Sequence, residues 1–496
     1  MSTDIQGDTC AATVTDYLAG PHPMLIGDTW VPAASGATLP VEDPATGRVI
    51  ASIPAGDDED VDRAVRAARA TFCARTWRGT PAKRRGEILW AISDLIVAHA
   101  DELARIEVLD NGMPLAMARG LLDGVIEGFR YFAGACTRLH GRTADMGADL
   151  EYHAFAVSEP VGVAGLIVPW NGPLASLSNK LAPALAAGCS VVVKPAEQTS
   201  LSTLRLVELV LEAGVPPGVV NVVTGTGAAA GAALVAHDDV DKISFTGSIE
   251  VGRGIVEASA GNLKRVTLEL GGKSPVFVFD DADLAAAIPV VGSGIFANSG
   301  QVCFAGSRVY AQSGILDDLV SGLAEHARNL RVGNGLDAGT QIGPLISDRQ
   351  RARVLDYIAS GRAEGGEVVT GGAPVGDAGY FVEPTIFTGG RPDMRIVREE
   401  IFGPVLTVMP FGGLDDVPTI GNAGPYGLGA GVFTRDIGVA HRAVRLLDAG
   451  NVWVNCYGRR DRSLPFGGFK QSGWGRENGP EGLDAYLEKK SVYIHL

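Results

Sequence analysis

The sequence predicts an α/β fold with two doubly wound domains, and three observations support this prediction. From Val161 onward, short apolar runs alternate with helical stretches, which is typical of a parallel sheet with helices on both faces. A second series of the same kind begins at Val276 and continues past Glu383. The length of 496 residues suits two or three domains with a large buried core.

The elements that precede the first series and those within it each follow from a local sequence pattern. Residues 60–72 and 84–109 are predicted helices, because apolar residues of the second recur every three or four positions. Residues 1–22 show no such period and are predicted to be a loose tail. The strands expected here are 163–168, 190–193, 219–223, 243–245 and 265–268, with helices over 202–213 and 228–236 between them.

The second series is expected to start with a strand over 276–279, after a Gly271-Gly272 turn. A domain boundary at this turn would place Glu269 and Cys303 on opposite sides of an interdomain cleft. The C-terminal run 487–496 is β-prone and has no obvious partner strand nearby. From the residues alone, docking in its own subunit and exchange with another subunit are equally consistent.

Composition narrows the classes of function. The formal net charge of −15 disfavours nucleic acid and anionic membranes as partners. No apolar run approaches 18 residues, and the first residues lack the basic and apolar regions of a secretory signal. The six cysteines are far apart and show no metal-ligand pairing, so we expect no metal and a reducing, cytoplasmic setting.

Cys303 is the candidate nucleophile. Small, turn-permitting residues flank it from Ser299 to Arg308, as suits a thiol held at a loop-to-helix junction where backbone N–H groups can face it. A candidate base, Glu269, follows an apolar strand and precedes the Gly-Gly turn. Taken alone, a single cysteine is more often a buried core thiol. The occurrence of several further motifs reverses that preference.

Six motifs occur in one order along the chain: Pro169-Trp170-Asn171, Phe245-Thr246-Gly247-Ser248, Leu268-Glu269-Leu270-Gly271-Gly272-Lys273, Gly300-Gln301-Val302-Cys303, Glu400-Ile401-Phe402-Gly403-Pro404 and Pro465-Phe466-Gly467-Gly468. With these motifs the chain resembles the NAD(P)-dependent aldehyde dehydrogenase superfamily from about Met24 to Leu496. The resemblance implies a Rossmann-like NAD-binding domain, a catalytic domain and a small β oligomerisation arm that extends a neighbouring subunit's sheet. It also implies a homotetramer or homodimer. The implied parts are 23–139 with 160–270 for NAD binding, 271–470 for catalysis, and 140–159 with 480–496 for the arm.

The resemblance assigns cofactor contacts to several strand ends. Lys194 and Glu197 would bracket the adenosine ribose, where a carboxylate accepts from a free 2′-OH and repels a 2′-phosphate, so NAD is expected over NADP. Ser248 would face the pyrophosphate at a helix N-terminus, Glu400 would hold the nicotinamide ribose, and Phe402 would pack on the ring. Taken singly, Glu400 and Phe402 would be a surface acid and a core aromatic, and the glycines from 225 to 231 a plain turn. Further contacts are expected at Ile167, Val168, Pro169, Trp170, Gly227, Gly231, Phe245, Thr246, Gly247, Leu270 and Gly271.

The implied reaction is oxidation of an aldehyde to a carboxylate. The Cys303 thiolate would attack the carbonyl carbon, and the Asn171 amide with the Cys303 N–H would stabilise the oxyanion. Glu269 would then activate the water that hydrolyses the thioester, for which a raised pKa is suitable. Lys180 and Glu477 resemble proton-relay residues behind this site.

The substrate is less well defined by the sequence. By resemblance, Gly172, Ser176 and Asn179 line the substrate tunnel with Phe466, and their small or polar side chains predict a wide or wet tunnel. Opposite them, Arg459, Arg460 and Arg462 depart from an apolar family pattern. Arg460 is our candidate contact for a substrate anion. A solvated loop or a subunit salt-bridge network is the alternative for these arginines, and the residues alone favour it.

Two rival functions stay open. A CoA-acylating semialdehyde dehydrogenase would resolve the thioester with CoA and would not need Glu269. A non-catalytic binding or structural protein on the same scaffold would be expected to lose the catalytic set, whereas Asn171, Glu269 and Cys303 are all present.

Overall fold

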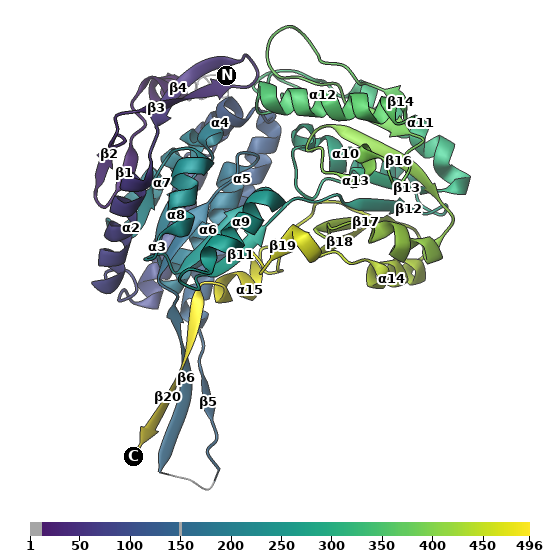
Figure 1. The fold of residues 1–496 in the computed structure, drawn as a ribbon. Coiled ribbons are helices and arrows are strands. Elements are labelled where there is room, and N and C mark those ends of the chain that lie inside the picture. Colours follow the sequence, from purple (N-terminus) through teal and green to yellow (C-terminus); the bar gives the residue numbers. More distant parts are fainter. Residues whose placement is uncertain (1–11, 148–150) are drawn as a thin grey trace, which may run out of the picture.

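The computed structural model describes residues 12–147 and 151–496, which form two large sheets and a protruding three-stranded arm. The two sheets with their helices lie side by side as two lobes, and the arm extends away from the first lobe (Figure 1). The predicted α/β class with two mainly parallel sheets is therefore confirmed.

The first sheet has the strand order β19-β11-β10-β7-β8-β9-β1-β2. Its five central strands are parallel, whereas β1, β2 and β19 are antiparallel additions at the edges. The strand order reverses beside β7, which places a crevice at the carboxyl ends of β7 and β10. The bounds are β1 Met24–Ile26, β2 Thr29–Val31, β7 Val163–Ile167, β8 Ser190–Lys194, β9 Val220–Val222, β10 Lys242–Thr246, β11 Arg265–Glu269 and β19 Gly473–Trp474.

Helices cover both faces of this sheet, and two predictions about the N-terminal region are wrong. The predicted helix 84–109 is two helices, because the backbone leaves the helical region at His99, whose ring contacts Glu102 at 2.7 Å. The expected tail contains a helix over residues 12–19, which is anchored by buried Val14, while residues 1–11 lie outside the described chain. The bounds are α2 Asp58–Cys73, α3 Ala82–Ala98, α4 Ala100–Asn111, α5 Leu115–Ala135, α6 Pro173–Ala187, α7 Leu201–Glu212, α8 Ala232–Ala236 and α9 Ile249–Ser259, with a separate hairpin of β3 Thr38–Asp43 and β4 Arg48–Pro54.

The second sheet has the order β14-β15-β16-β13-β12-β17-β18, and only its edge strand β14 pairs antiparallel. The chain crosses from β11 of the first sheet to β12 of the second through residues 270–274. The bounds are β12 Pro275–Val278, β13 Arg308–Gln312, β14 Glu367–Thr370, β15 Thr385–Thr388, β16 Val405–Phe411, β17 Gly429–Phe433 and β18 Asn451–Val454, with α10 Leu284–Phe296, α11 Leu316–Asn329, α12 Asp348–Ala363, α13 Arg395–Arg398, α14 Ile437–Leu446 and α15 Gly479–Asp484.

The arm consists of β5 (Arg142–Ala144), β6 (Tyr152–Pro160) and β20 (Leu487–His495). The C-terminal strand β20 pairs antiparallel with β6 along its whole length (Figure 1). No partner strand of the C-terminal run is nearby in sequence, as expected, and its partner comes from the distant segment that was expected to form the arm with it. Among the helices of the described residues, none is long and apolar enough to cross a membrane.

Candidate active site

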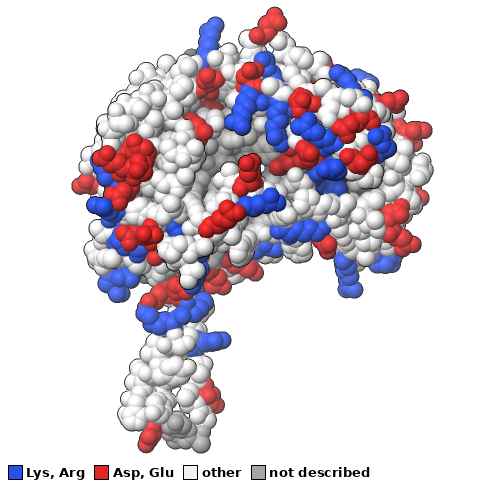
Figure 2. Space-filling model, in the orientation of Figure 1, with Lys and Arg blue, Asp and Glu red and all other residues white. Residues whose placement is uncertain are grey.

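A cavity of about 490 Å³ lies between the two sheets and receives residues from both. Figure 2 shows this face of the molecule hollowed between the lobes. Cys303, Glu269 and Asn171 all line the cavity, so the three groups expected to perform the chemistry meet in one place. Eight predicted cofactor residues line it with them: Pro169, Trp170, Thr246, Gly247, Ser248, Gly271, Glu400 and Phe402.

Cys303 lies in a loop between a 3-10 turn, Ala297–Gly300, and strand β13. The predicted loop-to-helix junction is therefore wrong, since a strand follows this loop. Asn298, Ser299 and Gly300 have φ values of 48°, 55° and 73°, an unusual run of left-handed backbone. A Cβ at Gly300 would lie 2.0 Å from the carbonyl oxygen of Gly403, so only glycine fits there. The loop depends on strained backbone and on close approach rather than on regular structure.

Asn171 joins the Cys303 loop to the first sheet. Its side-chain Nδ2 donates to the backbone carbonyl of Gln301 at 2.8 Å, and the backbone carbonyl of Asn171 accepts from Asn298 Nδ2 at 2.9 Å. The amide nitrogen carries two hydrogens, so one N–H remains for an acceptor in the cavity. Asn171 can therefore fix the loop and donate to an oxyanion at the same time.

The Cys303 thiol is protonated in this environment. Burial raises its pKa to about 12, and nearby Glu269 and Glu400 raise it further, while Arg460 opposes the shift. A thiol with this pKa needs a base within the cavity before it can attack a carbonyl carbon.

Glu269 ends strand β11 and is the candidate base. Its side chain is buried, and within the described chain neither carboxylate oxygen has a hydrogen-bond partner. Burial raises its pKa well above the usual range, Glu477 adds to the shift, and Lys180 opposes it. A buried carboxyl with a raised pKa and no hydrogen-bond partner holds a proton more tightly than a free glutamate does, which suits a general acid–base role.

Lys180 and Glu477 form a buried ion pair behind Glu269. Lys180 Nζ also donates to Thr246 Oγ1 at 2.7 Å, and Asn179 Nδ2 donates to Glu477 Oε2 at 3.3 Å. Arg462 donates to the side-chain oxygen Oδ1 of Asn179 at 2.5 Å. Asn179, predicted to line the substrate tunnel, is instead buried with its amide engaged in this polar network, because two charged groups bind its two ends.

Gly271 and Gly272 let the segment 270–274, which joins the two sheets, pass close to both Glu400 and the Cys303 loop. A Cβ at Gly271 would lie 2.1 Å from Glu400 Oε2, and one at Gly272 would lie 2.4 Å from the Cys303 carbonyl oxygen. The Gly272 N–H donates to Glu400 Oε1 at 3.0 Å, and burial raises the pKa of Glu400 to about 7. The Gly-Gly pair therefore brings Glu400 and the nucleophile loop together.

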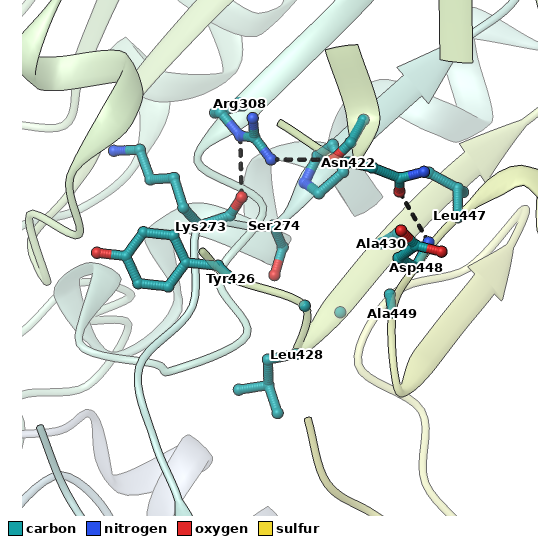
Figure 3. A pocket seen from close by; sticks show the side chains of 14 residues that line it. Lys273, Ser274, Arg308, Asn422, Tyr426, Leu428, Ala430, Leu447, Asp448 and Ala449 are labelled. Carbon is teal, nitrogen blue, oxygen red and sulfur yellow. Dashed lines mark hydrogen bonds between the residues drawn. The ribbon is translucent and has the colours of Figure 1, made fainter. Parts of the chain in front are cut away.

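Arg308 anchors the far end of that segment. Figure 3 shows its guanidinium donating to the Lys273 carbonyl, a bond of 2.9 Å, beside a small pocket, while the Lys273 ammonium points away. The guanidinium also donates to the Gly421 carbonyl at 3.3 Å. The pocket holds about 10 Å³, the space of one water molecule, so it is too small for a substrate.

The remaining cofactor predictions fall into two groups. Lys194 ends β8, and its Nζ lies 3.4 Å from Oε2 of Glu197, just after the strand. Gly227 and Gly231 bound a π-helical turn, and Gly231 faces the aliphatic stem of Lys194. By contrast, the side chain of Leu270 turns to a separate pocket beside α9, because successive residues of an extended chain point to opposite faces. The side chains of Ile167, Val168 and Phe245 are packed in the core.

Sequence reasoning missed the residues around the start of α12. Ser347 accepts from the Gln350 N–H as the N-cap, and Arg353 donates to the Glu400 carbonyl at 2.8 Å. Figure 2 shows Lys and Arg side chains gathered on the α12 side of the hollow. The only available signal was a serine followed by a charged helical stretch, which occurs at many helix starts. The missed residues of the cavity wall are Gln198, Ile346, Ser347, Arg349, Gln350 and Arg353.

The arginine-rich segment after Tyr457 contains three different environments. Arg462 is bound by Asn179 and Asn478, Arg459 is exposed, and Arg460 lies against aromatic rings. None of the three forms an ion pair within residues 12–147 and 151–496, and the exposure of Arg459 and Arg460 leaves the alternative of a solvated loop or a salt-bridge network with another subunit open. Of the other tunnel predictions, Phe466 is buried, Gly172 faces open space and Ser176 is half-buried.

Comparisons with known proteins show the family of this chain. The family described as "Aldehyde dehydrogenase family" matches residues 30–492. Aldehyde dehydrogenase 1 of Tanacetum cinerariifolium is 47% identical over 95% of this chain and 94% of its own, and phenylacetaldehyde dehydrogenase of Pseudomonas fluorescens is 46% identical over 97% of both. The NAD+ complex of an aldehyde dehydrogenase from Bacillus cereus superposes with a TM-score of 0.96, at 44% identity over 98% of both chains.

Proposed function

This chain belongs to the aldehyde dehydrogenase family, and we propose that it oxidises an aldehyde to a carboxylic acid with NAD as the hydride acceptor. The observation that carries the proposal is the convergence of Cys303, Glu269 and Asn171 on one cavity. That cavity also contains most of the side chains expected to hold the nicotinamide half of the cofactor.

The residues present fit a dinucleotide. The N-terminus of α9 lies at the cavity, and Ser248 Oγ accepts from the Val251 N–H while its own hydroxyl hydrogen remains available to a phosphate. Glu400 is a half-buried carboxylate suited to ribose hydroxyls, and Lys194 with Glu197 offers a second polar pair at a strand end. Glu197 favours NAD over NADP because its charge repels a 2′-phosphate.

In the first step, Glu269 accepts the proton of the Cys303 thiol. The sulfur then forms a bond to the aldehyde carbon, and the carbonyl electron pair moves to oxygen. The free N–H of Asn171 and the backbone N–H of Cys303 stabilise that oxyanion, with each such donor contributing about 3 kcal/mol in other enzymes. Bound nicotinamide supplies the acceptor for the hydride that leaves when the carbonyl re-forms as a thioester.

In the second step, Glu269 deprotonates a water molecule that attacks the thioester carbonyl. The carbon–sulfur bond breaks, the acid is released and the thiolate is regenerated. The Lys180–Glu477 pair behind Glu269 is suited to pass the proton away, because Glu477 acts directly on the Glu269 charge. The presence of this base favours hydrolysis of the thioester over CoA acylation, because CoA acylation would not need it.

We infer that the chain assembles as a homodimer or homotetramer through the arm. A three-stranded sheet with open edges and exposed apolar side chains at Tyr493 and Leu496 would be an aggregation hazard in a monomer. We also assign the protein to the cytoplasm, because the proposed chemistry requires a reduced Cys303, and the five described cysteines are free.

The test is NADH formation with short aliphatic, aromatic and carboxylated aldehydes, each with NAD and with NADP. We expect stoichiometric acid and NADH, with NAD preferred. The appearance of acyl-CoA after CoA is added would support the CoA-acylating alternative, and no turnover with any aldehyde would contradict the proposal.

A further inference from the structure

Arg460 lies beside the reaction centre and has no acidic partner among the residues that the structure describes. Its guanidinium carbon is 4.5 Å from the centre of the Phe304 ring and 4.4 Å from that of Phe466. Phe304 directly follows Cys303, and Arg460 acts on the pKa of both Cys303 and Glu269. The guanidinium is therefore held against two aromatic rings, one of which belongs to the residue next to the nucleophile.

The charged groups around Arg460 are engaged elsewhere. Glu477 is paired with Lys180 and accepts from Asn179, while Asp461 accepts from the hydroxyl of Ser463 at 2.6 Å. Within the described chain, Arg460 has neither an ion pair nor a hydrogen bond. Glu269, the remaining acid, has no partner either, and its pKa is raised.

The Arg460 side chain is exposed by surface area, yet it lies deep enough for burial to lower its pKa. These observations agree when the side chain contacts water on one side and is surrounded by protein on the others. Stacking on two rings compensates part of the cost of removing the cation from bulk water, but it leaves the planar N–H edge without an acceptor. An anionic group that brings acceptors to this edge would gain charge-assisted hydrogen bonds in the bidentate geometry that a planar guanidinium offers.

Two residues expected to line the substrate tunnel are small and leave space. A Cβ at Gly172 would meet nothing within 4 Å, and Ser176 is half-buried and presents a small hydroxyl. Side chains of this size give a bulky apolar substrate little packing and leave space for a polar end.

Resting on the proposed aldehyde oxidation, we propose that Arg460 binds a carboxylate at the far end of the substrate, so that the preferred substrates are aldehyde acids. Arg460 is then a specificity-determining residue. It selects the substrate through a bidentate pair with the carboxylate, and it does not take part in bond making at the aldehyde carbon.

Two matched pairs of aldehydes test the proposal: 4-oxobutanoate with its methyl ester, and 4-carboxybenzaldehyde with its methyl ester. Arg460→Gln is expected to lower kcat/KM for the acids by about 10- to 100-fold, mostly through KM, as expected for the loss of one charge-assisted pair. The esters should change by less than about threefold. Arg460→Lys should keep part of the preference for acids, because it retains the charge without the planar fork.

Arg459→Gln is the matched control, since it removes the same charge from the exposed neighbouring position. Equal losses for acids and esters in Arg460→Gln would show that the arginine acts on the thiol or on the fold, and would overturn the proposal. Acids and esters oxidised equally well by the unaltered protein would overturn it too, while leaving aldehyde oxidation in place. Failure to oxidise any of the four compounds would instead contradict the proposed function.

Discussion

The two walls of the cavity are built in opposite ways. The first wall consists of strand ends: Asn171 follows β7, Thr246 ends β10 and Glu269 ends β11, all in one parallel sheet. The second wall consists of loops, in which Cys303 follows a left-handed run and Phe402 has a φ of 58°. One wall is regular and the other is strained, and the nucleophile lies on the strained one.

The difference shows how the site is divided. A strand end fixes a side chain through the hydrogen bonds of the whole sheet, so the acid and the amide need few local contacts. A loop must be fixed residue by residue, through close approaches such as that of Gly300 to Gly403 and through bonds such as that from Asn171 to Gln301. Substitutions on the first wall should therefore change the chemistry, whereas those on the second should also change stability.

The largest effect is expected for Cys303→Ala. Removing the nucleophile should lower kcat by more than about 10³-fold, while NAD binding measured by calorimetry stays unchanged. Dehydrogenase turnover near the original rate would show that the loop wall does not carry the nucleophile.

Glu269→Gln should separate the two steps of the reaction. A single burst of NADH should remain, although it should be slower because the Cys303 thiol must then lose its proton to water, while steady turnover falls by about 10²- to 10⁴-fold because no base activates the attacking water. In the unaltered protein, steady turnover should rise with pH through the raised pKa of Glu269, since only the deprotonated form is a base. Full steady-state activity of the variant in a stopped-flow comparison would remove Glu269 from this role.

Gly300→Ala tests the strained wall directly. The left-handed φ and the approach to Gly403 should together lower the free energy of unfolding by about 3 kcal/mol and displace the Cys303 loop. Gly36→Ala is the control, because Gly36 has a φ of 69° but nothing within 4 Å, so its cost should be only about 1 kcal/mol. Equal costs in denaturant melts would show that close approach does not hold the loop.

The last effect concerns Glu107, which lies behind the regular wall and accepts from the Leu174 N–H of α6. Burial raises its pKa to about 8, so the folded state binds its proton more tightly than the unfolded state does. This group therefore stabilises the fold below about pH 4.3, and its contribution falls by up to about 1.4 kcal/mol per pH unit as the pH rises to about 8.

Glu107→Gln should flatten this decline in stability between pH 5.5 and 8, as measured by urea unfolding. Asp110 has a pKa raised by the same burial, so part of the slope should remain. Glu325→Gln on the exposed face of α11 is the control and should leave the slope unchanged. An identical slope in Glu107→Gln would show that Glu107 does not titrate in this range.

Sequence patterns predicted the regular wall better than the loop wall. The strand ends that carry Asn171 and Glu269 follow from apolar runs of strand length, since a parallel sheet gathers its carboxyl ends at one edge. The helix break at His99 could not be predicted, because the apolar period continues across it. The start of α12 was missed because its residues reach the cavity only by packing against a loop that is distant in sequence, as the bond from Arg353 to the Glu400 carbonyl shows.

The sequence by itself determined the α/β class, the order of the strands along the chain and the identity of the reactive side chains, because these depend on local periodicity and on short motifs. Only the tertiary structure decided which of those side chains share a cavity. It turned Leu270 away, enclosed Asn179 in a polar network and, among residues 12–147 and 151–496, left Arg460 without an ion-pair partner. The physical reason is that a side chain's partners lie mostly on segments distant in sequence, so packing between elements decides which charges are paired and which remain free for a ligand.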